Sequence, residues 1–188
     1  MDIIDNAISS GYQEFVRRTI QQDNFPWYFN EKITTHEVEK GDKNSGFSNL
    51  IFDWEREYQS EHFDMLIPIL YESLDKVGLF LKDLLRVRVG MFVKNQCEGK
   101  HHLPHVDYEF NHHTMLYYVT DSDGPTFFFD GDKITDQVEP KMGRSVIFDG
   151  SIYHASSTPN INPNRIVINY NFILWKYRQR KPNTLDIL

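Results

Sequence analysis

The chain has 188 residues, of which 40% are apolar and 14% aromatic, and its formal net charge is −7. This composition excludes a disordered chain and predicts one globular domain with a substantial core. The acidic balance also argues against a nucleic-acid partner, because phosphate-driven binding needs basic surface.

The N-terminal end is acidic and lacks the basic-then-apolar layout of a signal peptide. No apolar run approaches the length needed to span a bilayer. The single cysteine, Cys97, excludes an internal disulfide framework and fits a reducing compartment. We therefore expect a soluble, cytoplasmic protein without a membrane partner.

The first part of the chain predicts helices and loops. A helical spacing is shared by four apolar residues near the start, Tyr12, Phe15, Val16 and Ile20. A second helix is expected over about residues 65–84, where leucines recur on one stripe. Residues 39–48 are polar and predict a loop. Residues 1–84 are thus expected to form a helical support region.

From residue 85 onward the pattern changes to short strands bounded by turn signals. The predicted strands cover residues 86–93, 105–110, 113–120, 126–129, 135–139, 145–148, 151–154 and 165–176. Such strands, without intervening helices, predict a mostly β, α+β fold. The core expected over residues 85–177 is a double-stranded β-helix, or jelly roll, backed by the N-terminal helices. Residues 178–188 form a short tail of the same domain.

Two His-x-Asp sequences occur, His105-Val106-Asp107 and His62-Phe63-Asp64. In a strand, residues two apart project from one face, so His105 and Asp107 can reach one point in space. The other copy lies beside the predicted helix, where such residues diverge, and is set aside. A second imidazole, from His154, would complete two nitrogens and one oxygen on one side of a metal. This ligand set is expected of a non-haem Fe(II) oxygenase.

The last predicted strand has two chemically different faces. One face holds Ile166, Ile168, Tyr170 and Phe172, and the other holds Arg165, Val167, Asn169 and Asn171. In a simple sandwich the apolar face would point inward and the polar face into water. Alternatively, the apolar face lies beneath the helices and the polar face lines the interior, around a site. The pattern leaves both arrangements open.

Taken together, these motifs resemble the Fe(II)- and 2-oxoglutarate-dependent dioxygenases, and within them the prolyl-4-hydroxylase-like branch. The matching pieces follow the family's order over residues 86–177: His105-x-Asp107, Leu116-Tyr117-Tyr118-Val119, Gly124-Pro125-Thr126-Phe127-Phe128-Phe129, Val138-Glu139-Pro140-Lys141, Ser145-Val146-Ile147-Phe148, His154 and Arg165. The resemblance implies that His105, Asp107 and His154 are the catalytic ligands of Fe(II). It also implies that 2-oxoglutarate and O₂ are cosubstrates.

The resemblance further implies which residues bind 2-oxoglutarate. Arg165 would contact its distal carboxylate, since a planar guanidinium can donate two parallel hydrogen bonds. The Tyr118 hydroxyl would contact the same carboxylate, whereas Tyr117 points to the opposite face. Asn95 lies near a position where the family has a residue touching the cosubstrate. Asn169 is a further candidate, because it shares the polar face of the last strand with Arg165.

The implied reaction couples decarboxylation of 2-oxoglutarate to hydroxylation of an unactivated C–H bond. Asp107 favours hydroxylation, because related halogenases lack this carboxylate. The branch suggests a prolyl or other amino-acid side chain in a protein or peptide, and a free amino acid or small metabolite fits equally well. AlkB-type nucleic-acid demethylases carry a second arginine where this chain has Asn171, which also disfavours a nucleic-acid substrate.

Two other classes of protein compete with this interpretation. A non-enzymatic jelly-roll binding module explains the strands but leaves the His105, Asp107, His154 and Arg165 combination to coincidence. A cupin-like metalloprotein using Zn or Mn would have no need of Arg165. Four further histidines, His101, His102, His112 and His113, are expected in solvated loops rather than at the metal.

Overall fold

The computed structural model describes residues 1–31, 45–94 and 100–175. In chain order its elements are β1 (Asp2–Ile4), α1 (Ser10–Ile20), β2 (Tyr28–Asn30), β3 (Gly46–Asp53), β4 (Tyr58–Gln59), α2 (Phe63–Lys76), β5 (Leu81–Val93), β6 (His113–Tyr118), β7 (Thr126–Asp130), β8 (Lys133–Val138), β9 (Ser145–Asp149), β10 (Tyr153–Ala155) and β11 (Asn164–Leu174). Among these residues, no helix is long and apolar enough to cross a membrane.

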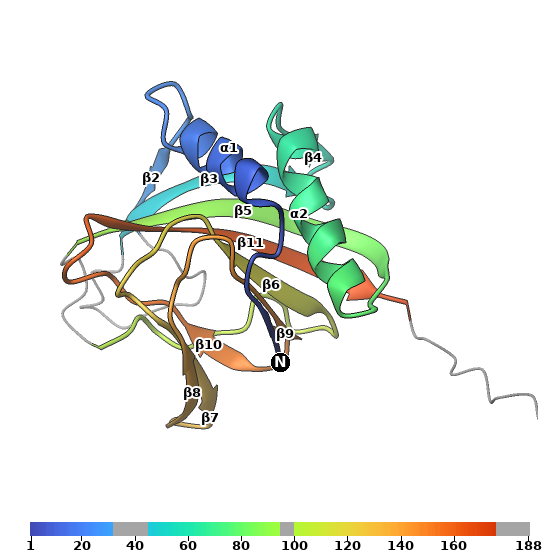
Figure 1. Cartoon of the computed structure of the whole chain (residues 1–188). Helices are drawn as coiled ribbons and strands as arrows, with labels where there is room; N and C mark the ends of the chain where they lie inside the picture. Colours follow the sequence, from blue (N-terminus) through green and yellow to red (C-terminus); the bar gives the residue numbers. More distant parts are fainter. Residues whose placement is uncertain (32–44, 95–99, 176–188) are drawn as a thin grey trace, which may run out of the picture.

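The strands form two antiparallel sheets. The larger sheet has the order β1-β9-β6-β11-β5-β3-β2, with β4 paired to β3, and the smaller one has the order β10-β7-β8. Both helices lie over one face of the larger sheet, and the smaller sheet lies on its other side (Figure 1). The predicted mostly β, jelly-roll architecture is confirmed.

The two helices begin and end where local chemistry allows. The Ser9 side chain caps α1 by accepting a hydrogen bond from the Tyr12 N–H at 3.4 Å. After α2, Gly78 adopts a φ of +68° and the Leu79 N–H donates to the Leu74 carbonyl at 3.0 Å. This is a Schellman motif, which stops a helix. The predicted end of α2 near residue 84 was therefore wrong, and Leu81 already belongs to β5.

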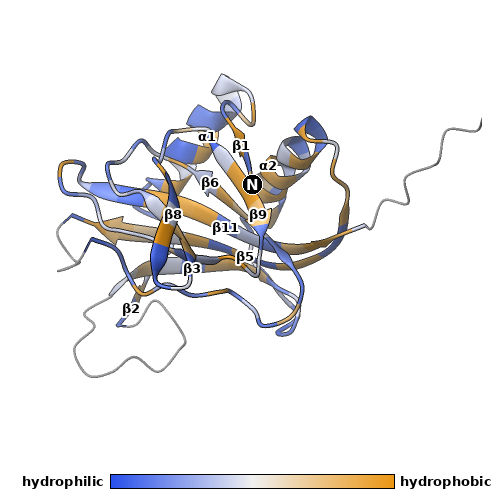
Figure 2. Cartoon of the chain, turned by 90° about the horizontal axis from the view of Figure 1, so that it is seen from below, coloured by the Kyte–Doolittle hydropathy of each residue, from blue (hydrophilic) through white to orange (hydrophobic). Residues whose placement is uncertain are grey.

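The helices bury one face of the central strands. Val16 and Ile20 of α1 pack with α2 side chains and with the apolar residues of β11, Ile166, Ile168, Tyr170 and Phe172. Much of β11 and β9 is accordingly hydrophobic in Figure 2. A second apolar cluster, which includes Leu116, Phe128 and Phe148, joins the two sheets. Of the two arrangements open for the last strand, the one with its apolar face beneath the helices is correct.

The structure differs from the predicted element pattern in two further places. Residues 1–84 contribute strands β1 to β4 as well as helices, and β2 and β3 extend the larger sheet beyond β5. Residues 105–110 do not form the predicted strand: His105 makes one isolated bridge with His154, and the chain then bends. The Asp107 side chain instead turns toward the larger sheet, where it finds hydrogen-bond donors.

Candidate active site

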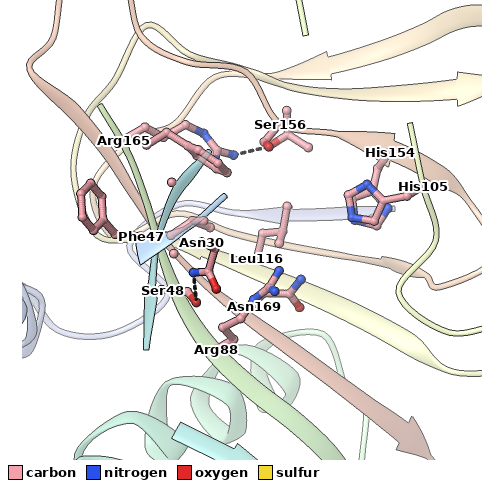
Figure 3. A pocket seen from close by; sticks show the side chains of 15 residues that line it. Asn30, Phe47, Ser48, Arg88, His105, Leu116, His154, Ser156, Arg165 and Asn169 are labelled. Atoms are coloured by element: carbon pink, nitrogen blue, oxygen red, sulfur yellow. Dashed lines mark hydrogen bonds between the residues drawn. The ribbon is translucent and has the colours of Figure 1, made fainter. Parts of the chain in front are cut away.

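A pocket lies on the inner face of the larger sheet, beside β7 and β10. Arg165 lies on one side of the pocket, and His105 and His154 lie on another (Figure 3). Arg88 of β5 and Asn169 of β11, which are opposite each other on paired strands, also line it. Two arginines and two histidines line the pocket, and no aspartate or glutamate of the described segments does so. A pocket of this character favours an anion, although the chain as a whole is acidic.

Strand register brings the polar side chains into one row. On β11, Arg165, Asn169 and Asn171 lie opposite Phe92, Arg88 and Arg86 of β5. On its other side, β11 places Asn169 and Asn171 opposite Leu116 and Thr114 of β6. Directly opposed residues project from the same face of a sheet. The alternation that buries the apolar residues under the helices therefore also fills the pocket with polar groups.

The two predicted histidine ligands lie side by side. The N–H of each donates to the carbonyl oxygen of the other at 3.0 Å, which fixes the backbone of both. Their ring centroids are 4.8 Å apart. A residue from the loop before β6 thus meets one from β10, although 49 positions separate them in the sequence.

Backbone contacts set the tautomer of both imidazoles. The Nδ1 atom of His105 lies 3.2 Å from the carbonyl oxygen of Leu103, and Nδ1 of His154 lies 3.2 Å from that of Ile152. Since a carbonyl only accepts hydrogen bonds, Nδ1 carries the proton and Nε2 keeps its lone pair. Burial lowers the pKa of His105 to about 4 and also lowers the pKa of His154, so both rings are neutral near pH 7. Neutral imidazoles with a free Nε2 are the form that binds metals.

Asp107 lies beside this pair in a buried, strongly hydrogen-bonded position. Its side chain is 3% exposed, and its Oδ2 lies 3.8 Å from Nε2 of His154. Arg86 donates to Oδ1 at 2.6 Å and Asn171 donates to Oδ2 at 2.9 Å, while Asn169 donates at 3.2 Å. Although burial raises the pKa of Asp107, electrostatic interactions with His154 and Arg86 outweigh it and hold the pKa far below its usual range. Asp107 is therefore a carboxylate.

The donor chemistry fits a ferrous ion, because two neutral imidazoles and a carboxylate are the ligand set of non-haem iron. His154 lies beside both His105 and Asp107, but the three side chains do not converge on one point. No group of three His, Cys, Asp or Glu side chains in residues 1–31, 45–94 and 100–175 stands in a geometry that could hold a metal ion. Asp107 instead leans toward Arg86. The ligand role of these residues stays a prediction.

Arg165 is the most deeply buried charged group of the pocket, with 1% of its surface exposed. Its Nε donates to the Gly124 carbonyl at 2.8 Å, and its Nη2 donates to Thr126 Oγ1 at 2.7 Å. Its Nη1 is buried without a hydrogen-bond partner, and no acidic side chain in the described segments pairs with the guanidinium. A buried, unpaired cation is costly, and desolvation accordingly lowers the pKa of Arg165. An anion bound at Nη1 would offset this cost.

Tyr118 lies next to this guanidinium, while its predicted contact with the cosubstrate stays a prediction. Its hydroxyl shares a 2.7 Å hydrogen bond with Thr126 Oγ1, which also accepts from Arg165. The Arg165 guanidinium lies 5.5 Å from the centre of the Tyr118 ring. Tyr117 is buried with the residues beneath the helices, on the opposite face of β6.

The remaining predicted residues have different outcomes. Asn169 lies in the pocket and contacts Asp107. Asn95 lies outside the described residues. His102 and His112 are 2% and 1% exposed, so the prediction that they lie in solvated loops was wrong. Their burial results from contacts between segments distant in sequence, such as the 2.8 Å bond of His102 Nδ1 with Ser156 Oγ.

Three polar residues of the site were missed. Thr126 joins Arg165 to Tyr118, while Arg86 bonds to Asp107 and Arg88 lines the pocket. The alternation over residues 86–89 was a usable signal, because it places both arginines on one strand face, opposite two valines. For Thr126, the sequence offers no comparable signal.

Comparisons with known proteins found matches to this fold among solved structures only. No protein-family model matches the chain, and no curated protein matches it either. Solved structures do. An oxidoreductase of the 2OG-Fe(II) oxygenase family from Burkholderia pseudomallei has a TM-score of 0.67 at 14% identity, over 91% of this chain and 84% of the other. A prolyl hydroxylase from Trichoplax adhaerens, in complex with a hypoxia inducible factor oxygen degradation domain peptide fragment, has a TM-score of 0.63 at 14% identity, over 92% and 82%.

A third structure is HygX from Streptomyces hygroscopicus, with nickel, 2-oxoglutarate and hygromycin B bound. It has a TM-score of 0.57 at 12% identity, over 90% of this chain and 81% of the other. At such identities the likeness establishes a shared fold. The chain therefore has the fold of the 2OG-Fe(II) oxygenases, prolyl hydroxylases among them, and what it does must be argued from its own site.

Proposed function

We propose that the protein is an Fe(II)- and 2-oxoglutarate-dependent dioxygenase that hydroxylates an unactivated C–H bond. The observation that carries this proposal is the unpaired guanidinium of Arg165 in a pocket that also contains two neutral imidazoles. A non-enzymatic binding module has no need of this combination. In the proposed reaction, 2-oxoglutarate, O₂ and the substrate C–H give succinate, CO₂ and the alcohol.

In this proposal His105, Asp107 and His154 hold Fe(II). The metal, when bound, supplies the redox chemistry by which O₂ is reduced and the 2-oxo acid is decarboxylated. The chain's own contribution is to orient its ligands. The Leu103 and Ile152 carbonyls keep each Nε2 unprotonated, and Asn171 holds one oxygen of Asp107.

Arg165 would orient the cosubstrate. Its free Nη1 can donate to the distal carboxylate of 2-oxoglutarate, while the bonds to Gly124 and Thr126 keep the guanidinium in place. Tyr118 stabilises Thr126 from the other side. Because the guanidinium is already desolvated and fixed, binding a carboxylate there loses little conformational entropy.

For the substrate, we propose two chemical classes. The Trichoplax enzyme was solved with a peptide and HygX with hygromycin B, so this fold accommodates both peptides and small molecules. A prolyl or other amino-acid side chain in a protein or peptide is one class. A free amino acid or small metabolite is the other.

The test uses the full chain without oxygen. Addition of Fe(II) and 2-oxoglutarate should produce the visible charge-transfer band of the metal chelate, and exposure to air should then give succinate. Asp107→Ala should lower succinate formation about 1,000-fold, because it removes a proposed metal ligand. Asp83→Ala is the matched control, since Asp83 is half exposed and pairs with Lys82 outside the pocket. Full turnover by Asp107→Ala would refute the ligand assignment, and absence of the band would favour a binding module.

A further inference from the structure

Arg88 is a second cation in the pocket, and the proposed binding of iron and 2-oxoglutarate does not use it. It is partly buried and lines the pocket from the central strand β5. Among the described residues it forms no ion pair and no side-chain hydrogen bond. Desolvation, followed by the neighbouring Arg86 charge, lowers its pKa. A partly buried guanidinium without a partner is costly unless an anion binds to it.

Asp107, the acidic group whose charge raises the pKa of Arg88, already has hydrogen-bond donors from other residues. Asp107 accepts hydrogen bonds from Arg86, Asn169 and Asn171. These donors come from both β5 and β11, and they account for both carboxylate oxygens. Arg88 therefore is not needed to neutralise Asp107, and its positive charge remains available to a ligand.

Arg88 also lies well apart from Arg165 along the sheet, so the two arginines need not bind the same carboxylate. Phe92 lies opposite Arg165, and Asn169 lies opposite Arg88, so the two arginines are four positions apart along the paired strands. At about 3.3 Å per residue, their backbone positions are roughly 13 Å apart along the strands. A carboxylate held by the free Nη1 of Arg165 therefore leaves Arg88 without an anion.

The position of Arg88 relative to the histidines indicates what its anion is. Arg88 is close enough to both His105 and Asp107 for its charge to act on them. An anionic group on Arg88 would therefore lie beside the proposed iron ligands, where the C–H bond to be oxidised must also lie. Ser48 and Asn30, which are hydrogen-bonded to each other at 2.8 Å, line the same pocket from β3 and β2 (Figure 3).

We propose that Arg88 anchors a carboxylate of the substrate, which is therefore a small carboxylic acid such as a free amino acid. The assignment rests on the proposed oxygenase function and narrows it. A carboxylate matches the planar, two-donor edge of a guanidinium, because it can accept two parallel hydrogen bonds from it. A neutral side chain within a polypeptide would leave the Arg88 charge unpaired.

The experiment measures succinate formation by the Fe(II)- and 2-oxoglutarate-saturated protein with a panel of probes. The probes are the free L-amino acids, each compared with its own amide. We expect at least one free acid to stimulate succinate formation, and its amide to stimulate at least 10-fold less, since the amide lacks the charge that Arg88 binds.

Substitutions then test whether Arg88 is responsible. Arg88→Gln should raise the KM for the stimulating acid about 100-fold, while the KM for the cosubstrate in the same variant changes little. Arg88→Lys keeps the charge without the planar fork, so it should restore part of the loss. Arg18→Gln is the matched control, because Arg18 is exposed on α1 and pairs with Glu14. It should leave both constants unchanged.

The stability of the Arg88→Gln variant shows whether Arg88 serves ligand binding or holds the fold together. Because Arg88→Gln removes an unpaired desolvated charge, it should raise Tm by about 2–4 °C. The assignment is overturned if amides stimulate as well as acids, if no acid stimulates, or if Arg88→Gln retains the wild-type KM for the acid. A charge-transfer band and succinate formation without stimulation by any acid would leave the proposed oxygenase function standing. Absence of the band would remove both.

Discussion

The two faces of the central strands β5, β6 and β11 differ in whether their buried side chains have all the partners they need. On the face beneath the helices, Ile168, Tyr170 and Val89 are fully buried among other apolar side chains. On the face toward the pocket, Arg165 is just as buried, but its Nη1 has no hydrogen-bond partner among the described residues. The same backbone therefore supports a closed core on one side and an incomplete polar arrangement on the other.

The two faces therefore contribute differently to stability and to ligand binding. Burial of apolar groups stabilises the fold directly, at roughly 25 cal/mol per Å². Burial of Arg165 and Arg88 without an acidic partner in the described segments opposes folding, so the proposed binding of anions, rather than stability, would account for the two arginines. Substitutions on the apolar face should consequently lower stability, whereas substitutions on the polar face should weaken ligand binding.

The largest effect on stability is expected from the apolar face. Ile168→Ala should lower the free energy of unfolding by about 3 kcal/mol, because Ile168 is fully buried and its removal leaves a cavity. Urea denaturation of the purified protein measures this. Ile161→Ala is the matched control, since Ile161 is 81% exposed, and its stability should be nearly unchanged. Equal losses in both variants would mean that the packing under the helices is wrong.

The next effect is expected at the polar face, in binding rather than in stability. Arg165→Met should weaken 2-oxoglutarate binding about 100-fold, because it removes the guanidinium that would bind the distal carboxylate. Arg165→Lys should lose about 10-fold, since it keeps the charge but not the two-donor geometry. Titration of the anaerobic charge-transfer band measures both. Unchanged affinity in Arg165→Met would place the cosubstrate elsewhere.

The smallest effect concerns a buried histidine at the pocket's edge. Burial lowers the pKa of His102 from 6.5 to about 4. Between these two pH values His102 is protonated in the unfolded chain but neutral in the folded protein. Its contribution to stability is therefore present above pH 6.5 and is lost as the pH falls toward 4, at up to about 1.4 kcal/mol per pH unit. His102→Phe should reduce this slope. Urea denaturation between pH 7 and 5 measures how the free energy of unfolding changes with pH. The same dependence in the variant and the wild type would contradict the prediction.

Much of the architecture could be predicted because it rests on local alternation. The strand of Arg165 and Ile166 shows period two in the sequence, and β11 has it. The His105 and His154 pair was also predicted, from residue type and strand context, and the structure brings the two rings together. The end of α2 was missed, because the leucine pattern continues into β5 although Gly78 stops the helix.

The parts that could not be predicted depend on partners distant in sequence. Asp107 is not in a strand, and its orientation follows from Arg86 and Asn171, which are 21 and 64 residues away. Likewise, His102 looks like a loop histidine until Ser156 is placed beside it. No local pattern encodes such contacts, because they form only when strands pair.

The mostly β fold, the alternating faces of the last strand and the residue types available for a metal site could all be predicted from the residue pattern. Which face lies beneath the helices, and that Arg165 and Arg88 are at least partly buried without carboxylate partners in the described part of the chain, became clear from the packed structure alone. The physical reason is that alternation is a local property of a strand. Burial and charge pairing, in contrast, depend on the sheets and helices that pack against it.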